Sequence, residues 1–277
     1  MRVTCERHLF TSTAQAQGYA LAGAGPALIG SARLREAVEA AAFRLSGLEP
    51  LRADNLVVLP VEELLLVGRV TPLPRDWSGR SGRYVALVTL PLAEVASLPT
   101  ASVAPLLLSE ALANALPAHE AVAPRLAAEG ARRVELTSVT LEVETPAEER
   151  LRRLDLHEPL DAAMQLETEG RAVCPLPAQP LDFLLGVLLL HPRASRAKLG
   201  FGLGLRPPNA TAGLGIALWL STADAPAPPP ADAETKRALS EARASFAQAA
   251  GAMAFYSSPD ALDPGPRTIA EEVAALL

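Results

Sequence analysis

The chain has 277 residues, of which 49% are hydrophobic, 20% charged and 4% aromatic, and its formal net charge at pH 7 is −6. This apolar content supplies a sizeable core, which excludes disorder along the whole chain, and the length suits one or two domains. The acidic balance and the short basic clusters argue against nucleic-acid binding, because nucleic-acid binders usually present a basic stripe to the phosphates.

The first part of the chain predicts a hairpin followed by a helix. Residues 8–13 carry β-forming side chains, and residues 17–21 can return antiparallel to them. A helix is expected over 31–46, because its apolar side chains recur on one face, and Gly47 suits its C-terminal end.

Extended segments dominate the next forty residues. Short strands are expected at 56–59 and 64–70. The prolines and glycines of residues 71–82 indicate a loop. The almost wholly apolar, β-branched run 83–90 is typical of a central strand buried on both faces.

Helical and extended patterns then alternate irregularly. We expect a helix over 103–116 and a shorter or kinked one over 120–129, because the latter contains Pro124. Residues 134–143 predict one strand whose alternation changes phase at Thr137-Ser138, which indicates a bulge.

A capping box marks the next helix start. Thr145, Pro146 and Glu148 are spaced so that Thr145 caps the first turn and Glu148 completes the box.

The last third begins with an apolar helix, predicted over 181–190 and ended by His191-Pro192. It continues as follows: paired strands over 199–205 and 214–221, a Pro/Ala-rich linker, and helices over 234–250 and 268–277.

These elements predict an α+β fold, with a mixed, largely antiparallel sheet, packed helices and a C-terminal helical segment. We divide the chain into a core over 1–222, with two subdomains meeting near residue 145 as one option, a linker over 223–233 and a helical segment over 234–277.

Neither targeting nor cysteine chemistry is indicated. No apolar run follows the basic residues at the N-terminus, and the longest apolar run, 183–190, is far too short to span a bilayer, so a cytoplasmic location is expected. Cys5 and Cys174 are too isolated for a disulfide framework or a zinc site and are expected to act as small buried hydrophobes.

No catalytic, cofactor or metal residue is predicted. The glycines of 200–204 and 213–215 lack the lysine of a phosphate-binding loop, and Cys5 and His8 would point to opposite faces of a strand. The segment 155–161 concentrates three carboxylates and a histidine, but a solvated turn accounts for these residues equally well. We therefore expect no cofactor, and enzymatic activity is not favoured.

The loop over 75–83 is the candidate for binding. It places Arg75, Arg80 and Arg83 beside Trp77, and arginine and tryptophan are enriched among the residues that dominate protein interfaces. We interpret these four residues as a partner-binding site; the alternative is an ordinary loop that leads into a strand.

Five stretches of the chain also resemble a known family. Asp76–Val88, together with the opening Phe10–Thr13 and Gly18–Leu21, resembles the N-terminal domain of bacterial GTPase-associated adaptor proteins. Leu184–His191 and Lys198–Phe201 resemble that family's Leu-rich helix and following strand, so that the likeness covers about residues 7 to 222.

The resemblance implies an adaptor linked to small Ras-like GTPases in multi-component bacterial systems, with no known enzyme activity. Arg83 stands where the family has Asn and Leu87 where it has His, so a site built on those polar residues would be lost here. The leading hypothesis is thus a non-enzymatic adaptor or scaffold that engages a protein partner. The alternative is a small-ligand-binding or hydrolytic domain with a dispersed site.

Overall fold

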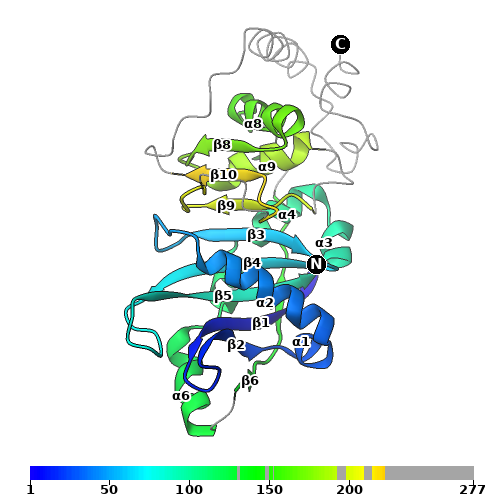
Figure 1. Cartoon of the computed structure of the whole chain (residues 1–277). Helices are drawn as coiled ribbons and strands as arrows, with labels where there is room; N and C mark the ends of the chain where they lie inside the picture. The colour runs from blue at the N-terminus through cyan, green and yellow to red at the C-terminus, as the bar shows by residue number, and fades with distance from the viewer. Residues whose placement is uncertain (130–131, 147–149, 152, 192–197, 209–213, 222–277) are drawn as a thin grey trace.

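The computed structural model describes the chain apart from residues 130–131, 147–149, 152, 192–197, 209–213 and 222–277. Within the described part, ten strands form one mixed, mostly antiparallel sheet with helices packed on it, so the predicted α+β fold is confirmed (Figure 1). The predicted linker over 223–233 and the helical segment over 234–277 lie outside the described residues.

The sheet has the order β6-β2-β1-β5-β4-β3-β9-β10-β8, and β7 pairs with the other end of β1. Its strands are β1 (Arg2–Thr13), β2 (Gly18–Ala24), β3 (Leu56–Val61), β4 (Leu64–Leu73), β5 (Gly82–Pro91), β6 (Val134–Glu135), β7 (Val139–Glu142), β8 (Ala172–Pro175), β9 (Phe201–Leu203) and β10 (Leu218–Ser221). Three of the pairs are parallel, namely β2 with β6 and β10 with both β8 and β9.

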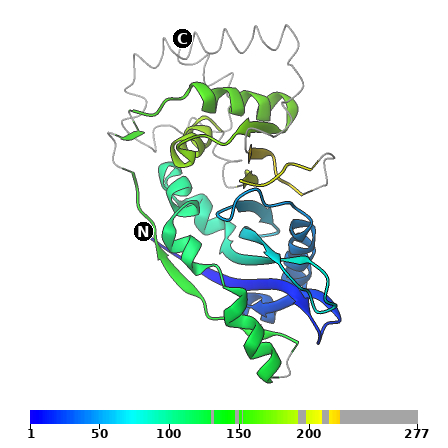
Figure 2. The ribbon, with the colours of Figure 1, turned by 90° about the vertical axis from the view of Figure 1, so that its left-hand side faces the viewer.

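Helices cover both faces of the sheet (Figures 1 and 2). On one face lie α1 (Pro26–Gly30) and α2 (Ala32–Ser46), with their own apolar core. The other face carries α3 (Leu92–Ser97), α4 (Thr100–Leu107), α5 (Glu110–Ala115), α6 (His119–Glu129), α8 (His157–Glu169) and α9 (Pro180–Leu190).

Several local signals in the sequence are confirmed. Strand β5 lies between β1 and β4, and its residues from Val85 to Leu90 are buried, as expected of a central strand. The helix predicted over 31–46 is confirmed as α2, and Gly47 ends it as expected. Ser31, which the prediction placed inside the helix, precedes it and caps it by accepting a hydrogen bond from the Leu34 amide at 3.3 Å.

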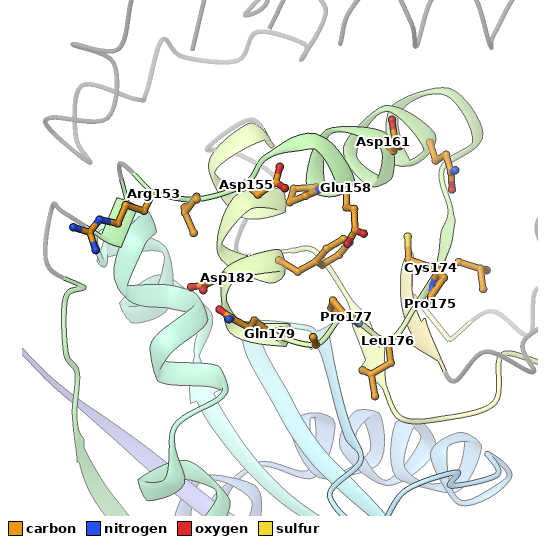
Figure 3. Close-up of a pocket in the computed structure, with 16 residues that line it drawn as sticks. Arg153, Asp155, Glu158, Asp161, Cys174, Pro175, Leu176, Pro177, Gln179 and Asp182 are labelled. Carbon is orange, nitrogen blue, oxygen red and sulfur yellow. The ribbon is translucent and has the colours of Figure 1, made fainter. Parts of the chain in front are cut away.

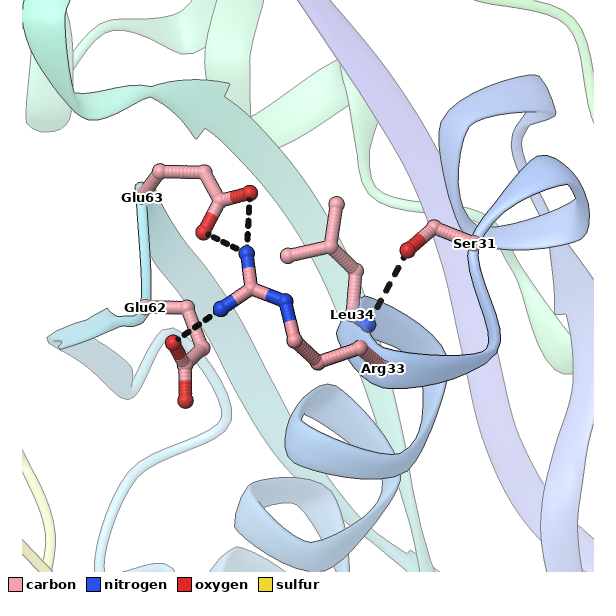
Figure 4. A network of polar contacts seen from close by, with 5 residues as sticks. All are labelled: Ser31, Arg33, Leu34, Glu62 and Glu63. Atoms are coloured by element: carbon pink, nitrogen blue, oxygen red, sulfur yellow. Dashed lines mark hydrogen bonds and ion pairs between the residues drawn. The ribbon is translucent and has the colours of Figure 1, made fainter.

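An exposed ion-pair network joins the start of α2 to the β3–β4 turn (Figure 4). The Arg33 guanidinium lies 2.7 Å from Glu62 and 2.7 Å from Glu63, and Glu62 occupies the left-handed region at φ 53°. These contacts tether the helix start to a turn that the sequence separates from it by about thirty residues.

The prediction of one helix over 103–116 is wrong. The chain forms α4 and α5 instead, preceded by α3, which the sequence reading missed. Leu108 leaves the helical conformation at φ −103° and ψ 11°, and the Ser109 hydroxyl caps α5 by accepting from the Leu112 amide at 3.0 Å. A capping serine therefore restarts the helix in a new direction.

The prediction of one bulged strand over 134–143 is also wrong. The segment forms two short strands with different partners: β6 runs parallel to β2, and β7 runs antiparallel to the first residues of β1. The change of phase at Thr137-Ser138 thus marks the place where the chain crosses from one neighbour to the other.

The structure bears on two further predictions, the strands over 199–221 and the capping box at Thr145, only in part. Strands β9 and β10 are shorter than predicted and pair in parallel. Thr145 shares a hydrogen bond of 2.8 Å with Ser102, whereas the remainder of its predicted capping box falls on residues 147–149, outside the described residues.

The apolar helix over 181–190 is confirmed as α9, which is buried from Phe183 to Leu190. No single helix in the described ranges has both the length and the apolar character needed to cross a membrane. The segments Thr100–Leu107 and Glu110–Ala128 meet that requirement only as a pair, with a bend of 47° between them.

The sheet and one of its cores continue past residue 145. Strand β9 pairs antiparallel with β3 through Leu56 to Val58, and the core on the α4 face joins residues such as Val67 and Leu185. The chain on either side of residue 145 therefore shares hydrogen bonds and buried apolar surface, and the subdomain break proposed there stays a prediction.

Candidate protein-interaction surface

The β4–β5 loop, residues 74–81, is held in a fixed shape by Asp76. One carboxylate oxygen, Oδ1, accepts from the Ser78 amide at 2.8 Å, from the Ser78 hydroxyl at 2.7 Å and from the Arg80 amide at 3.0 Å. These hydrogen bonds, that of the Ser78 hydroxyl foremost, lower the pKa of the Asp76 carboxyl below its ordinary value of 3.8. Gly79 takes φ 85°, a conformation that favours glycine and closes the turn.

This ordered loop exposes three of the four predicted binding residues, whereas Arg83 lies on β5. Trp77 is 47% exposed, while its amide donates to the Ser12 hydroxyl of β1 at 3.1 Å. Arg75 and Arg80 are exposed and Arg83 is half-buried. Within the described part of the chain, none of these three arginines forms an ion pair with a carboxylate. The loop therefore places Arg75 and Arg80 beside an exposed indole, and the Asp76 carboxylate offsets part of the Arg80 charge.

Arg83 links the loop to the end of α2. Its guanidinium donates to the carbonyl oxygens of Ser46 and Gly47, each at 3.4 Å, which suits the negative end of a helix dipole. Its amide donates to the Tyr19 hydroxyl at 3.2 Å. A methyl group at Gly82 would overlap that hydroxyl, so any larger residue there would displace the Tyr19 hydroxyl from its present position.

A hollow of about 710 Å³ opens beside Arg83. Its walls come from the end of α2, from β2, and from the chain that leads into and out of the loop, and they include Tyr19, Phe43, Pro50, Pro72 and Arg83. Arg75, Trp77 and Arg80 do not line it. The structure thus brings Arg83 together with aromatic residues that the sequence reading missed.

The missed residues form an aromatic series that runs from the core to the surface. Phe10 is buried, stacks on Tyr19 with 5.8 Å between ring centroids, and meets the edge of Phe43 at 6.5 Å. Phe43 is 64% exposed. The one available signal was Phe43 itself, an aromatic residue on α2 away from the apolar stripe of Val38, Ala42 and Leu45.

A second hollow, of about 780 Å³, lies between the start of α8, strand β8 and the start of α9 (Figure 3). Acidic residues dominate its polar lining: Asp155, Glu158, Asp161 and Asp182. Asp182 is paired with Arg150 at 2.8 Å. In the described ranges, no group of three or more His, Cys, Asp or Glu side chains is placed to hold a metal ion.

Neither cysteine is suited to nucleophilic attack. Burial, followed by the nearby Glu158 charge, raises the pKa of the Cys174 thiol to about 11, so the thiol stays protonated at neutral pH. Burial likewise raises the pKa of Cys5. Cys5 is buried as predicted, whereas Cys174 is only half-buried and lines the second hollow.

The buried histidine has a structural role. His8 Nδ1 accepts from the Gly25 amide at 3.1 Å, so its Nε2–H donates to the Thr89 hydroxyl at 2.8 Å. Burial lowers the pKa of His8 to about 3, which keeps the ring neutral. His8 therefore joins β1 to β5 and to the turn before α1.

No family model matches the chain, and comparison with curated proteins and with solved structures likewise gave no match.

Proposed function

We propose that this chain is a non-enzymatic adaptor that binds a partner protein through the β4–β5 loop. The observation that supports the proposal is the loop itself: its backbone is ordered by Asp76, and it exposes Trp77 together with Arg75 and Arg80. An ordered loop loses little conformational entropy on binding, and Trp and Arg contribute more to interfaces than most residues.

A small Ras-like GTPase is the partner that we propose to test first. This choice rests on the sequence resemblance to GTPase-associated adaptor proteins, carried by Asp76–Val88 and by the opening hairpin. The loop at the centre of that resemblance is also the one that exposes Trp77.

The test is capture of partners from native cells by the tagged full chain, with identification by mass spectrometry. We expect a stoichiometric partner that is lost when Trp77→Ala and Arg80→Ala are combined. The control combines Ile29→Ala with Arg2→Ala, which removes one exposed apolar side chain and one exposed arginine elsewhere. Equal recovery with the loop variant and the control would overturn the proposal.

Small-ligand binding is the second candidate, and the hollow of about 780 Å³ below α8 favours it, because its volume falls in the range of ligand pockets. A thermal-shift screen of metabolites against the purified chain tests this candidate. We expect any hit to disappear in Phe183→Trp, which places extra bulk at a wall of that hollow.

A further inference from the structure

The hollow beside Arg83 differs in charge from the molecule as a whole. The chain carries a net charge of −6, yet the charged residues that line this hollow are two arginines, Arg44 and Arg83, and one carboxylate, Glu49. Glu49 is 3.3 Å from the Arg206 guanidinium, so its charge is already balanced. The Arg83 guanidinium, which forms no ion pair with a carboxylate among the described residues, is therefore the positive charge on which a ligand in the hollow can act.

Aromatic and proline residues form much of the remaining wall, and Ser46 and Ser81 also line it. Tyr19 and Phe43 are braced through the buried Phe10 ring, and Pro50 and Pro72 have restricted backbones. Pro50 is also held by an isolated β-bridge to Leu205. Such walls accept an apolar side chain with little loss of conformational entropy.

One charged donor is positioned at the wall. Two carbonyl oxygens at the end of α2 hold the Arg83 guanidinium through Nη1, and the guanidinium carries five N–H donors in all. Its other nitrogens, Nε and Nη2, make no hydrogen bond among the described residues and suit a carboxylate.

We infer that this hollow is the specificity pocket of the interface, and that it receives an acidic segment of the partner, with an apolar side chain seated between Tyr19 and Phe43 and a carboxylate on Arg83. The inference rests on the proposed function, since it names the part of the partner that an adaptor of this kind would bind. Charge complementarity selects the occupant: a basic or neutral segment would leave the Arg83 charge uncompensated at the contact.

The experiment places a photo-reactive side chain in the hollow. Phe43→p-benzoylphenylalanine is introduced into the full chain in native cells, the cells are irradiated, and the cross-linked peptides are sequenced by mass spectrometry. We expect a peptide from another protein with at least two Asp or Glu residues next to the cross-linked apolar residue. We also expect its yield to fall at least tenfold when Arg83→Gln is added.

Three outcomes would overturn the inference: a cross-linked segment without acidic residues, a cross-link confined to this chain or to a second copy of it, or no cross-link at all. If the Trp77- and Arg80-dependent partner is still captured, the adaptor proposal stands and only the pocket assignment fails. If no partner depends on the loop, both fail.

Because Arg83 also contacts the end of α2, a second test measures the affinity for the identified partner with Arg83 left unchanged. Phe43→Ser leaves the Arg83 contacts in place and should weaken binding about tenfold, as is typical when an interface anchor is truncated. Ile29→Ser, at an exposed apolar residue on α1, is the matched control and should leave the affinity unchanged. Equal affinities for Phe43→Ser and the control would overturn the pocket assignment.

Discussion

At the scale of single residues, the shape of the candidate surface depends on polar groups that satisfy backbone amides. Asp76 holds the β4–β5 loop, Ser12 anchors Trp77 to β1, and Tyr19 accepts the Arg83 amide. Without these acceptors, the loop amides would be left to water, and the loop would lose the fixed shape that exposes its indole.

Asp76 gives the first prediction. Asp76→Ala should speed hydrogen exchange of the Ser78 and Arg80 amides and weaken partner binding, because three hydrogen bonds are lost together. Asp76→Asn keeps an acceptor oxygen, so it should retain part of the parent chain's slow exchange and part of its affinity for the partner. Exchange rates that match those of the parent chain would contradict this account.

The same carboxylate predicts a pH dependence of the loop. Because the folded-state pKa of Asp76 lies below 3.8, its contribution is complete above about pH 4 and is lost as the pH falls through the lower folded value. Exchange at Ser78 and Arg80, corrected for intrinsic rates, should therefore accelerate only in that acidic range. The Asp76→Asn chain should show no such step.

His8 gives a third prediction, at higher pH. Its folded pKa of about 3 lies below the ordinary 6.5, so the unfolded chain binds the extra proton between these values, and stability rises with pH across that window. The slope from this one group is at most about 1.4 kcal/mol per pH unit. The free energies of unfolding in urea of the parent chain and of His8→Gln should differ most above pH 6.5 and converge as the pH falls. If the two free energies instead run parallel across this pH range, the lowered folded-state pKa of His8 is ruled out.

At the scale of elements, helices are placed by a few specific contacts as well as by their apolar faces. Helix α2 is capped by Ser31, tied to the β3–β4 turn through Arg33, and ended beside the interaction surface at Gly47. Helices α8 and α9 approach closely at Gly186, where an added Cβ would lie 2.7 Å from the Pro159 ring.

Gly186 tests this packing. Alanine is ordinarily about 1 kcal/mol better than glycine inside a helix. Gly186→Ala should nevertheless lower the free energy of unfolding, by roughly 1–3 kcal/mol, because the proline ring cannot yield without moving α8. Gly30→Ala, at the end of α1 with open space around it, is the control and should be nearly neutral. A stabilised Gly186→Ala chain would show that the two helices are packed less tightly.

At the scale of the whole molecule, the two ends of the sheet are joined at β3 and β9. Three residue pairs, from Leu56↔Leu203 to Val58↔Phe201, connect the strands that carry the loop with those beside α8. The apolar core on the α4 face runs across this junction. One hydrogen-bonded sheet with a shared core favours unfolding in a single step.

Trp219, which is buried in β10, provides the probe for that step. In a Trp77→Phe chain, Trp219 is the sole tryptophan, because the sequence contains two. Its fluorescence and the far-ultraviolet circular dichroism should report the same urea midpoint. Two separated transitions would instead support a subdomain break near residue 145.

The sequence by itself determined the features that depend on near neighbours in the chain. Side-chain period, turn residues and breakers predicted the opening hairpin, α2 with its end at Gly47, the central strand β5 and the buried helix α9. It also identified the loop of Arg75, Trp77, Arg80 and Arg83, because turn chemistry and residue type are local.

Only the tertiary structure decided what depends on distant partners. Strands β6 and β7 separate because β2 and β1 present different edges to them, and Ser109 restarts the helix where packing requires a turn. The hollow exists because Tyr19, Phe43 and Arg83, each on a different element, meet in space. Such meetings follow from the pairing of strands and the burial of faces, which no local pattern in one sequence specifies.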